Sequence, residues 1–593
     1  MTQFQIDKRD MMFNLKECPG LAPLQESGGF EDCDEDTLEM IFDQSFSFCE
    51  KVLAPLLAPG DRQGCRFENG QVLLPEGMAE AWETYKEMGM IGMNCTSEYG
   101  GSELPHFFST PATEMECGSF VSFSMLPMLT RGAARLVSSF GSQDLKDTYL
   151  EKMFNGEWSG TMCLTEPSAG SDVGASVTVA VPDGDNYKIK GTKIFISWGQ
   201  HDLTENIIHL VLARIKGSPR GSKGLSLFVV PRNRLDADGN AGENNDVACG
   251  NIEHKMGINA CPTCVINFGS DDACTGYLVG EVNLGMRYMF QMMNEARLEV
   301  GIQGMAQGSS AYRQALVYAS ERVQGVTVAE SGPRPAQIIE HPDVRRMLVK
   351  MRALVQGSRS LIYHTMLYMD LAAHHPTEKE KYQSLVDLMV PLCKSYGSDQ
   401  GFRVTEMAVQ TYGGYGFCQE YPVEQYMRDS KITSIYEGTN GIQAMDLVFR
   451  KILMNKGAFL GLWAQEAAAL IGACAGTQLV PLTKTLGEAV EAVVATATYF
   501  GECAAKGGGE LVQFLATDFQ EHMGHVVVGY FLLKQSLVAS QALDGDSSAE
   551  DTHFYEQKIV TTRYFFESFI PAAIAALANM RETNSAGLQA EFA

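Results

Sequence analysis

Apolar residues recur at helical spacing in the N-terminal part of the chain. From Leu38 onward, positions about 3.6 residues apart are apolar, as on one face of a helix. These positions include Ile41, Phe42, Phe46, Cys49, Val52 and Leu53. The pattern predicts helices up to about Gly156.

Between about Ser159 and Asn283 the chain instead contains short runs rich in β-branched and aromatic residues. The clearest runs lie at 177–181, 207–212 and 225–230. Turn-forming residues such as those at 182–185 separate them, and no helical pattern intervenes. Strands joined by short turns predict an antiparallel β domain.

Helical spacing returns from Arg287 and continues past Arg450. One apolar face comprises Met289, Met292, Met293, Ala296 and Val300. A polar insertion at 326–335 separates this helix from the next. Beyond residue 456, the glycines at 507–509 and the acidic stretch at 544–551 divide the tail into three expected helices.

These patterns predict an α+β multidomain protein. We expect an N-terminal helical domain at 1–158, a central antiparallel β domain at 159–283 and a C-terminal helical bundle at 284–455. An extra helical domain follows at 456–593. It carries no cluster of catalytic residue types, so we expect it to serve packing or subunit contact.

Composition and charge narrow the class of protein. The 593 residues are 45% hydrophobic and 20% charged, which is typical of a globular protein. A net charge of −26 argues against nucleic acid as a partner. The N-terminal segment lacks the apolar core of a signal peptide, and no uninterrupted apolar run is long enough to span a bilayer. We therefore expect a cytoplasmic protein.

The chain has 15 cysteines, which a cytoplasmic protein keeps as thiols. Cys261 and Cys264 have the C-x-x-C spacing of a zinc or redox site, with Cys249 before them and Cys274 after them. The outer spacings are uneven, and Cys264 begins an apolar run typical of a strand. We favour a buried Cys264 and expect no metal.

One carboxylate occupies an informative position. Glu437 follows Tyr436 and precedes Gly438-Thr439-Asn440-Gly441. A glycine turn can hold a carboxylate rigidly while its backbone N–H groups face a ligand, as general-base catalysis at carbon requires. The competing interpretation is a solvated turn residue.

Further motifs place Glu437 in context. A Thr-Glu-Pro-Ser-Ala-Gly-Ser-Asp segment lies at 165–172 and a Gln-Thr-Tyr-Gly-Gly segment at 410–414. Glu-Tyr-Pro-Val-Glu at 420–424 and Met-Arg-Asp at 427–429 follow, just ahead of Glu437. This ordered set resembles the acyl-CoA dehydrogenase family of flavoproteins, from about Leu38 to Arg450.

The resemblance implies FAD as the cofactor, bound by four segments. The implied contacts are Cys163, Leu164, Thr165 and Ser171; Phe195, Ile196 and Ser197; Gln410, Thr411, Tyr412, Gly413 and Gly414; and Thr439 and Gly441. Phe195 stands where a tryptophan is common, and Trp198 follows it. The glycines after Tyr412 can equally form a helix C-cap. No G-x-G-x-x-G follows a strand, so a Rossmann site is not supported.

Two further residues imply an oligomer. Arg322 and Gln324 match family residues that reach the FAD of a neighbouring subunit. The resemblance therefore implies a homo-oligomer, either a dimer or a tetramer. The aromatic residue usual after Gln324 is missing, and the insertion follows.

The resemblance also implies the reaction. Glu437 would remove the α-proton of an acyl-CoA, and the β-hydride would pass to flavin N5, giving a trans-2-enoyl-CoA. Implied substrate contacts are Ser171, Asn294, Arg297 and Gly438. Glu295 competes for the role of base, because some relatives supply their base from this helix. The expected electron acceptor is an electron-transfer flavoprotein.

The sequence also leaves open a more specific dehydrogenase, an oxidase and a protein without catalytic activity. Length and the extra helices most resemble a long bacterial branch that includes 3-(methylthio)propanoyl-CoA dehydrogenases. An acyl-CoA oxidase would share the fold and the base. A catalytically silent acyl-CoA-binding protein would retain the fold alone.

Overall fold

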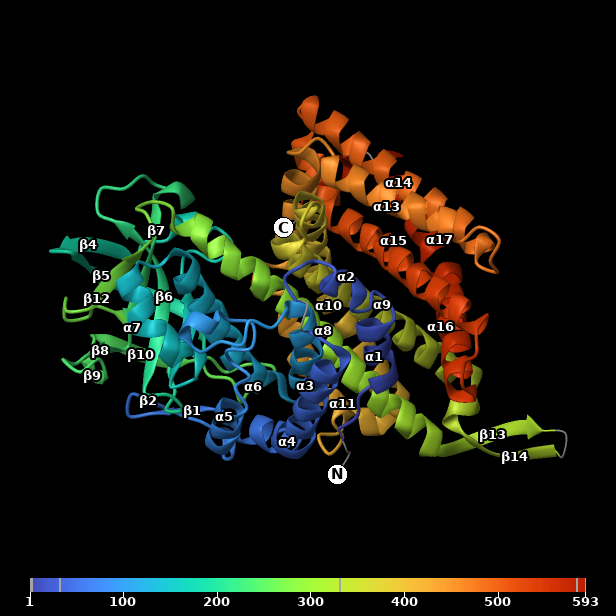
Figure 1. The fold of residues 1–593 in the computed structure, drawn as a ribbon, viewed down its shortest axis with the longest axis horizontal. Helices are drawn as coiled ribbons and strands as arrows, with labels where there is room; N and C mark the ends of the chain where they lie inside the picture. Colours follow the sequence, from blue (N-terminus) through green and yellow to red (C-terminus); the bar gives the residue numbers. More distant parts are fainter. Residues whose placement is uncertain (1–3, 31–32, 330–331, 583–584, 592–593) are drawn as a thin grey trace. The chain divides into compact units, whose positions relative to one another are not determined.

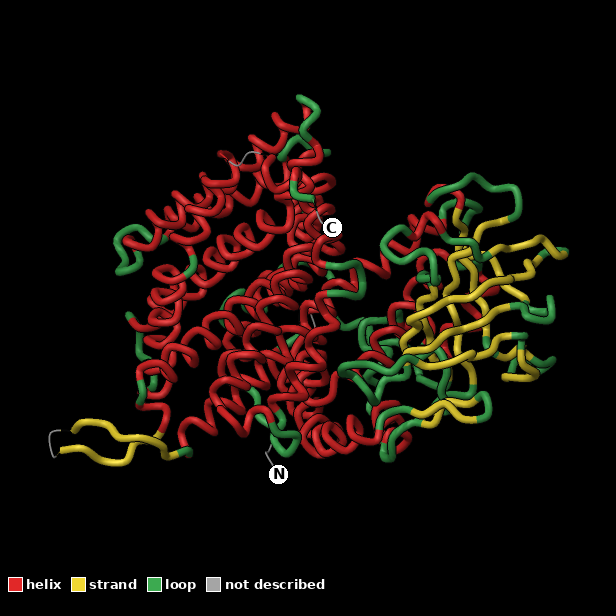
Figure 2. The backbone as a smooth tube through the Cα atoms, turned by 180° about the vertical axis from the view of Figure 1, so that it is seen from behind, coloured by secondary structure: helices red, strands yellow, loops and turns green. Residues whose placement is uncertain are grey.

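The computed structural model describes residues 4–30, 33–329, 332–582 and 585–591 (Figures 1 and 2). Its internal contacts divide the chain into two units. The β-containing unit comprises Phe42–Pro105 and Met115–Glu299. The helical unit comprises Met1–Ile41, His106–Glu114 and Val300–Ala593.

The predicted N-terminal helices are present. They are α3 (Glu35–Phe48), α4 (Ala54–Gln63), α5 (Met78–Glu87), α6 (His106–Phe140) and α7 (Gln143–Phe154). A short hairpin of β1 (Arg66–Glu68) and β2 (Gln71–Leu73) interrupts them. Helix α7 begins where the Ser142 side chain accepts a hydrogen bond from the Leu145 N–H, a standard N-cap.

The predicted strands form one large sheet, drawn in yellow in Figure 2. Its strands are β3 (Trp158–Cys163), β4 (Val179–Asp183), β5 (Asn186–Ser197), β6 (Asn206–Ile215), β7 (Leu225–Pro231), β10 (Val247–Ile252), β11 (Thr263–Phe268) and β12 (Thr275–Val279). Their order is β10-β11-β5-β12-β7-β6-β3, with β4 paired to β5 and β6. Strands β8 (Asn233–Leu235) and β9 (Ala241–Asn244) form a separate ribbon.

The sheet is mostly antiparallel, as predicted, but β3 and β4 run parallel to β6. Between β3 and β6 the chain passes through a long loop and the β4–β5 hairpin. A strand that returns after such a crossover can lie parallel to the strand it left. The alternation of apolar and polar residues along a strand does not reveal whether the neighbouring strand runs parallel or antiparallel to it.

A buried polar cluster lies among the helices of the β-containing unit. Glu116 on α6 is 2% exposed, and burial raises the pKa of its carboxyl to about 7. Its Oε1 accepts a hydrogen bond from the Tyr85 hydroxyl (3.1 Å), which in turn accepts one from Arg131 (3.2 Å). Its Oε2 has no hydrogen-bond partner among the described residues.

The helical unit contains the predicted C-terminal bundle. Its helices are α1 (Lys8–Lys16), α2 (Ala22–Gln25), α9 (Pro342–His374), α10 (Lys379–Tyr412), α11 (Val423–Ser430) and α12 (Asn440–Met445), together with the part of α8 (Gly285–Glu321) from Val300 onward. The polar insertion forms a hairpin of β13 (Val323–Ala329) and β14 (Gly332–Gln337), which extends from the helices in Figure 1. Val326 and Thr327 pair with Pro335 and Arg334.

The tail divides into more helices than the three predicted. They are α13 (Ala458–Ala473), α14 (Val480–Ala505), α15 (Gly509–Leu543), α16 (Ala549–Ser568) and α17 (Ile570–Glu582). Gly457 in a left-handed conformation precedes α13, and a proline in the first turn starts α14. Each of these helix starts is marked by a single residue in an otherwise helical pattern, so the pattern alone did not separate the helices.

Helix α15 is long and apolar enough to cross a membrane, by length and composition alone. Its most apolar window has a mean hydropathy of 1.3, and 72% of that window is buried inside the structure. It packs against α9, α12, α14 and α16. Such burial is typical of the core helix of a packed domain.

A buried ionic cluster connects the N-terminal segment to the tail. Arg359 on α9 is fully buried and bridges Asp10 of α1 and Glu114 of α6. Lys558 of α16 donates to the second oxygen of Asp10 (2.7 Å), and Tyr363 donates to Glu114 (2.9 Å). Each charge therefore has an opposite charge beside it, as buried charges require.

Replacing Arg359 by Met should lower the free energy of unfolding by about 3 to 5 kcal/mol, because Glu114 would remain buried without its cation. The control is Arg346→Met on the same helix, whose Asp343 partner is exposed and which should change stability by less than about 1 kcal/mol. Urea unfolding measures both. Equal, small losses would contradict a structural role for the cluster.

Replacing Glu116 by Gln should flatten the pH dependence of stability. The folded pKa of about 7 lies above the ordinary 4.5, so the folded protein retains a proton that the unfolded chain releases. This contribution is complete below pH 4.5 and is lost as pH rises through 7, a change of up to about 3 kcal/mol. Urea unfolding from pH 5 to 8 tests this. Identical slopes for both proteins would disprove it.

Candidate functional site

Glu437 lies in a turn with unusual backbone geometry. Its φ is +54° and that of Gly438 is +80°, so two successive residues are left-handed. A non-glycine residue in this region is strained and depends on its surroundings to remain there. Thr439 then caps helix α12, its hydroxyl accepting from the Ile442 N–H (3.3 Å). The Glu437 side chain is half-buried.

Side-chain hydrogen bonds hold this turn. The Nε2 atom of Gln443, a fully buried residue, donates to the carbonyl oxygens of Glu437 (3.2 Å) and Gly438 (3.0 Å). The hydroxyl of Tyr436 donates to Gln303. The turn is therefore attached to the helix that follows it and to α8.

Asn440, the first residue of α12, is held from the opposite side. Its Oδ1 accepts from Lys394 (2.7 Å), a fully buried residue of α10, and its Nδ2 donates to Ser398 (3.0 Å). Burial raises the pKa of the neighbouring Asp399, and a hydrogen bond with Asn440 opposes the rise. Sequence reasoning gave no role to Gln443, Lys394 or Asn440.

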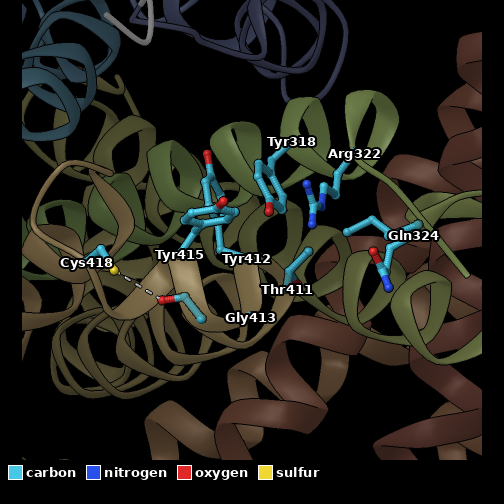
Figure 3. Close-up of a pocket in the computed structure, with 10 residues that line it drawn as sticks. Tyr318, Arg322, Gln324, Thr411, Tyr412, Gly413, Tyr415 and Cys418 are labelled. Atoms are coloured by element: carbon cyan, nitrogen blue, oxygen red, sulfur yellow. Dashed lines mark hydrogen bonds between the residues drawn. The ribbon is translucent and has the colours of Figure 1, made fainter.

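A pocket of about 420 Å³ lies at the end of α10 (Figure 3). It is lined by Tyr318, Arg322, Gln324, Ile338, Thr411, Tyr412, Gly413, Gly414, Tyr415 and Cys418. The rings of Tyr318 and Tyr412 stack with centroids 4.0 Å apart and 13° between planes. An open slot with aromatic walls and a guanidinium suits a flat ligand that also carries negative charge.

Many of the residues expected to contact the flavin line this pocket. Arg322 lies 5.7 Å from the ring of Tyr415, and the carbonyl of Gln324 interacts with His341 Nε2 (2.8 Å). Gly413 is also the C-cap of α10, with φ +62°, so the cap interpretation and the pocket are compatible. Gln410 is exposed and does not line the pocket.

Of the remaining expected flavin contacts, Thr439 and Gly441 lie in the helical unit at the start of α12, and the others lie in the β-containing unit. Cys163 ends β3, and the loop that follows runs beside β5, where the Ile194 N–H donates to the Thr165 carbonyl (2.9 Å). Phe195 has φ +59° and is 59% exposed. Leu164 and Ile196 are buried, Ser197 is half-buried and Ser171 is exposed.

Phe195, and not Trp198, offers an aromatic face in this unit. Trp198 is fully buried, and its indole N–H donates to the Ser122 carbonyl (3.2 Å). Of these two aromatic residues, the exposed Phe195 is therefore the one available for stacking.

A buried ion pair fixes these two segments to each other. Lys193 of β5 lies 2.7 Å from the Glu166 carboxylate and also donates to the Leu164 carbonyl (2.9 Å). Burial alone would raise the pKa of Glu166, but Lys193 and hydrogen bonds at Thr178 and Val177 lower it overall. The burial of Lys193 could have been predicted from the sequence. Side chains alternate between the two faces of a strand, so Lys193 lies on the same buried face of β5 as Ile189.

The alternative base, Glu295, is already paired. Its carboxylate lies 3.3 Å from Arg135, and burial raises its pKa while Arg135 opposes the rise. Arg297, which is 3% exposed, donates to the Asn294 side chain (3.2 Å). The two expected substrate contacts on α8 are therefore in contact with each other.

The cysteines of the C-x-x-C motif lie inside the β-containing unit. In the part of the chain that the structure describes, no three His, Cys, Asp or Glu side chains are arranged to hold a metal ion. Cys261 and Cys264 are fully buried, and Cys264 lies in β11 as expected.

Family models match nearly the whole chain. The acyl-CoA dehydrogenase N-terminal, middle and C-terminal domains match residues 35–157, 161–270 and 283–452. A model described as acetyl-CoA dehydrogenase C-terminal like matches 463–590.

Individual relatives cover the full length. The chain is 39% identical over 600 residues to 3-methylmercaptopropionyl-CoA dehydrogenase of Ruegeria pomeroyi, covering 99% of this chain and all of the relative. It is 36% identical to a butyryl-CoA dehydrogenase of Syntrophomonas wolfei, covering 98% and 97%. Its fold matches an acyl-CoA dehydrogenase of Bacillus anthracis complexed with FAD, at 20% identity and a TM-score of 0.74, covering 93% and 88%.

These matches extend over the extra helices as well as the three-domain core. They confirm the predicted fold class and the oxidoreductase class, and members of the matched family are FAD-dependent. The chain belongs to the acyl-CoA dehydrogenase family.

Proposed function

We propose that this protein is an FAD-dependent acyl-CoA dehydrogenase in which Glu437 removes the α-proton of the thioester. The observation that carries the proposal is the left-handed turn at Glu437 and Gly438, held by Gln443. Strain in a well-supported loop is common at catalytic positions. The motif order around the turn also matches the family to which the chain belongs.

The residues present fit a flavin. Phe195 offers an exposed ring on β5, and the pocket at the end of α10 combines an aromatic stack, Arg322 and glycine backbone. Thr165 and Ser197 would hold the ring system and the segment at 411–414 would contact the FAD, while Arg322 and Gln324 would reach the FAD of a neighbouring subunit. Bound FAD would supply the hydride acceptor, N5, for the β-hydrogen.

In this reaction the protein's own groups would remove the α-proton of the thioester and stabilise the enolate oxygen. The α-hydrogen of a thioester is weakly acidic, so its removal needs a base held in place and a donor for the enolate oxygen. Glu437 carries the base on its side chain and a donor on its backbone N–H. Displacement of water by the acyl chain would raise the pKa of the carboxyl and strengthen the base.

Glu437 is favoured over Glu295 because their surroundings differ. Glu295 is held in an ion pair with Arg135 at 3.3 Å, which occupies its carboxylate even though burial raises its pKa overall. Glu437 lies instead in a turn that fixes the direction of its side chain.

The substrate class follows from the relatives. Because the two full-length relatives described above are named for short acyl thioesters, we propose a short, saturated acyl-CoA, with 3-(methylthio)propanoyl-CoA as the first candidate. We further propose an electron-transfer flavoprotein as the acceptor, a homo-oligomer in which Arg322 and Gln324 reach a neighbour's FAD, and a cytoplasmic location.

Glu437→Gln should retain flavin and acyl-CoA binding but reduce the rate of flavin bleaching by at least about 100-fold, because the carboxamide cannot accept the proton. The measurement is anaerobic titration of the purified flavoprotein with short, medium, long, branched and thioether acyl-CoAs. Glu295→Gln is the control and should still bleach. Normal bleaching in Glu437→Gln together with its loss in Glu295→Gln would reverse the assignment.

A dehydrogenase should turn over with an electron-transfer flavoprotein and release little peroxide in air. An acyl-CoA oxidase would share the base but return its electrons to oxygen. Peroxide release and acceptor reduction, followed on one enzyme sample, separate the two. Stoichiometric peroxide without acceptor turnover would identify an oxidase.

A further inference from the structure

We propose that Gln443 is a positioning residue that fixes the direction of the Glu437 carboxylate. This inference rests on the proposed function, since it assumes that Glu437 is the base. Gln443 does not need to touch the substrate. It acts through the backbone of Glu437 and Gly438, to which its carboxamide is hydrogen-bonded.

The contact is specific to a carboxamide. A single Nε2 atom donates to two successive carbonyl oxygens, at 3.2 and 3.0 Å, and so uses both of its hydrogens. Oε1 is buried without a hydrogen-bond partner among the described residues. The opposite amide orientation would direct Oε1 at two carbonyl oxygens, so the hydrogen bonds determine the orientation.

These hydrogen bonds compensate for backbone strain. Glu437 is a non-glycine residue at φ +54°, a conformation that persists only when neighbouring groups stabilise it. Without the amide, two carbonyl groups would lose their donor and the turn could relax toward an ordinary φ. The Glu437 side chain would then leave its present direction.

The helix that carries Gln443 is itself held on two sides. Asn440, three residues earlier, is bonded to Lys394 and Ser398 of α10. Helix α12 also packs against α15 of the extra C-terminal domain. The extra domain therefore supports the helix from which Gln443 reaches the turn, although it supplies no reacting group.

The test is the rate of flavin reduction by acyl-CoA in Gln443→Met, which keeps the length of the side chain and removes both donors. We expect a loss of about 10- to 100-fold, since small displacements of a catalytic group have effects of this size. Flavin content and the dissociation constant for acyl-CoA should change little. The acidic limb of the pH–rate profile should also shift, because the carboxylate would leave its present surroundings.

The matched control is Gln535→Met. Gln535 is also fully buried in the helical unit, and its Nε2 donates to Asn14 (2.8 Å), away from the turn. It should lose stability without changing the pH profile. If Gln443→Met fails to fold, Gln443→Asn, whose shorter amide cannot reach both carbonyls, replaces it with the same expected result.

The outcomes separate the inference from the function on which it rests. A wild-type protein that no acyl-CoA bleaches contradicts the proposed function, whatever the variants do. A bleaching wild type with an unchanged rate and pH profile in the Gln443 variant overturns the positioning role. Equal losses in the Gln443 and Gln535 variants reduce Gln443 to a structural residue and also overturn it.

Discussion

The left-handed turn at Glu437 and Gly438 is the constraint on which this account depends. Two adjacent residues with positive φ direct the Glu437 side chain differently from an ordinary helix start. An isolated chain would not keep a glutamate in this conformation. It persists here because a buried carboxamide satisfies both carbonyl groups and the following helix is anchored through Asn440. Chemistry at carbon depends on this kind of preorganisation, since the base must already point at the proton.

Buried charges serve the same purpose elsewhere in the molecule. Glu166 and Lys193 attach the loop after β3 to β5, so that the segments expected to face the flavin are not free to separate. Arg359 attaches α9 to α1 and α6, and Lys558 brings the tail into the same cluster. Such pairs add little net stability compared with apolar packing, but each leaves a costly unpaired charge if its geometry is lost. They therefore favour one arrangement of the segments that they join.

The sequence predicted the parts of the structure that depend on local pattern. Helical and alternating periodicities gave the order of domains, and the motif around Glu437 indicated the residue on which the proposed chemistry rests. The parts that it missed depend on non-local contacts. The parallel pairing of β3 with β6, the hairpin in the insertion and the role of Gln443 cannot be deduced from neighbouring residues. Gln410 shows that a motif match alone does not place a residue at the pocket, because it belongs to the matching motif but is exposed and does not line the pocket.

The most direct measurement of the central claim is a crystal structure of the protein with FAD and an acyl-CoA analogue whose β position carries no hydrogen. The account predicts the Glu437 carboxylate about 3 to 3.5 Å from the α carbon, with the flavin ring on the opposite face of the acyl chain. A Glu437 side chain directed into bulk solvent, with another carboxylate beside the α carbon, would contradict it.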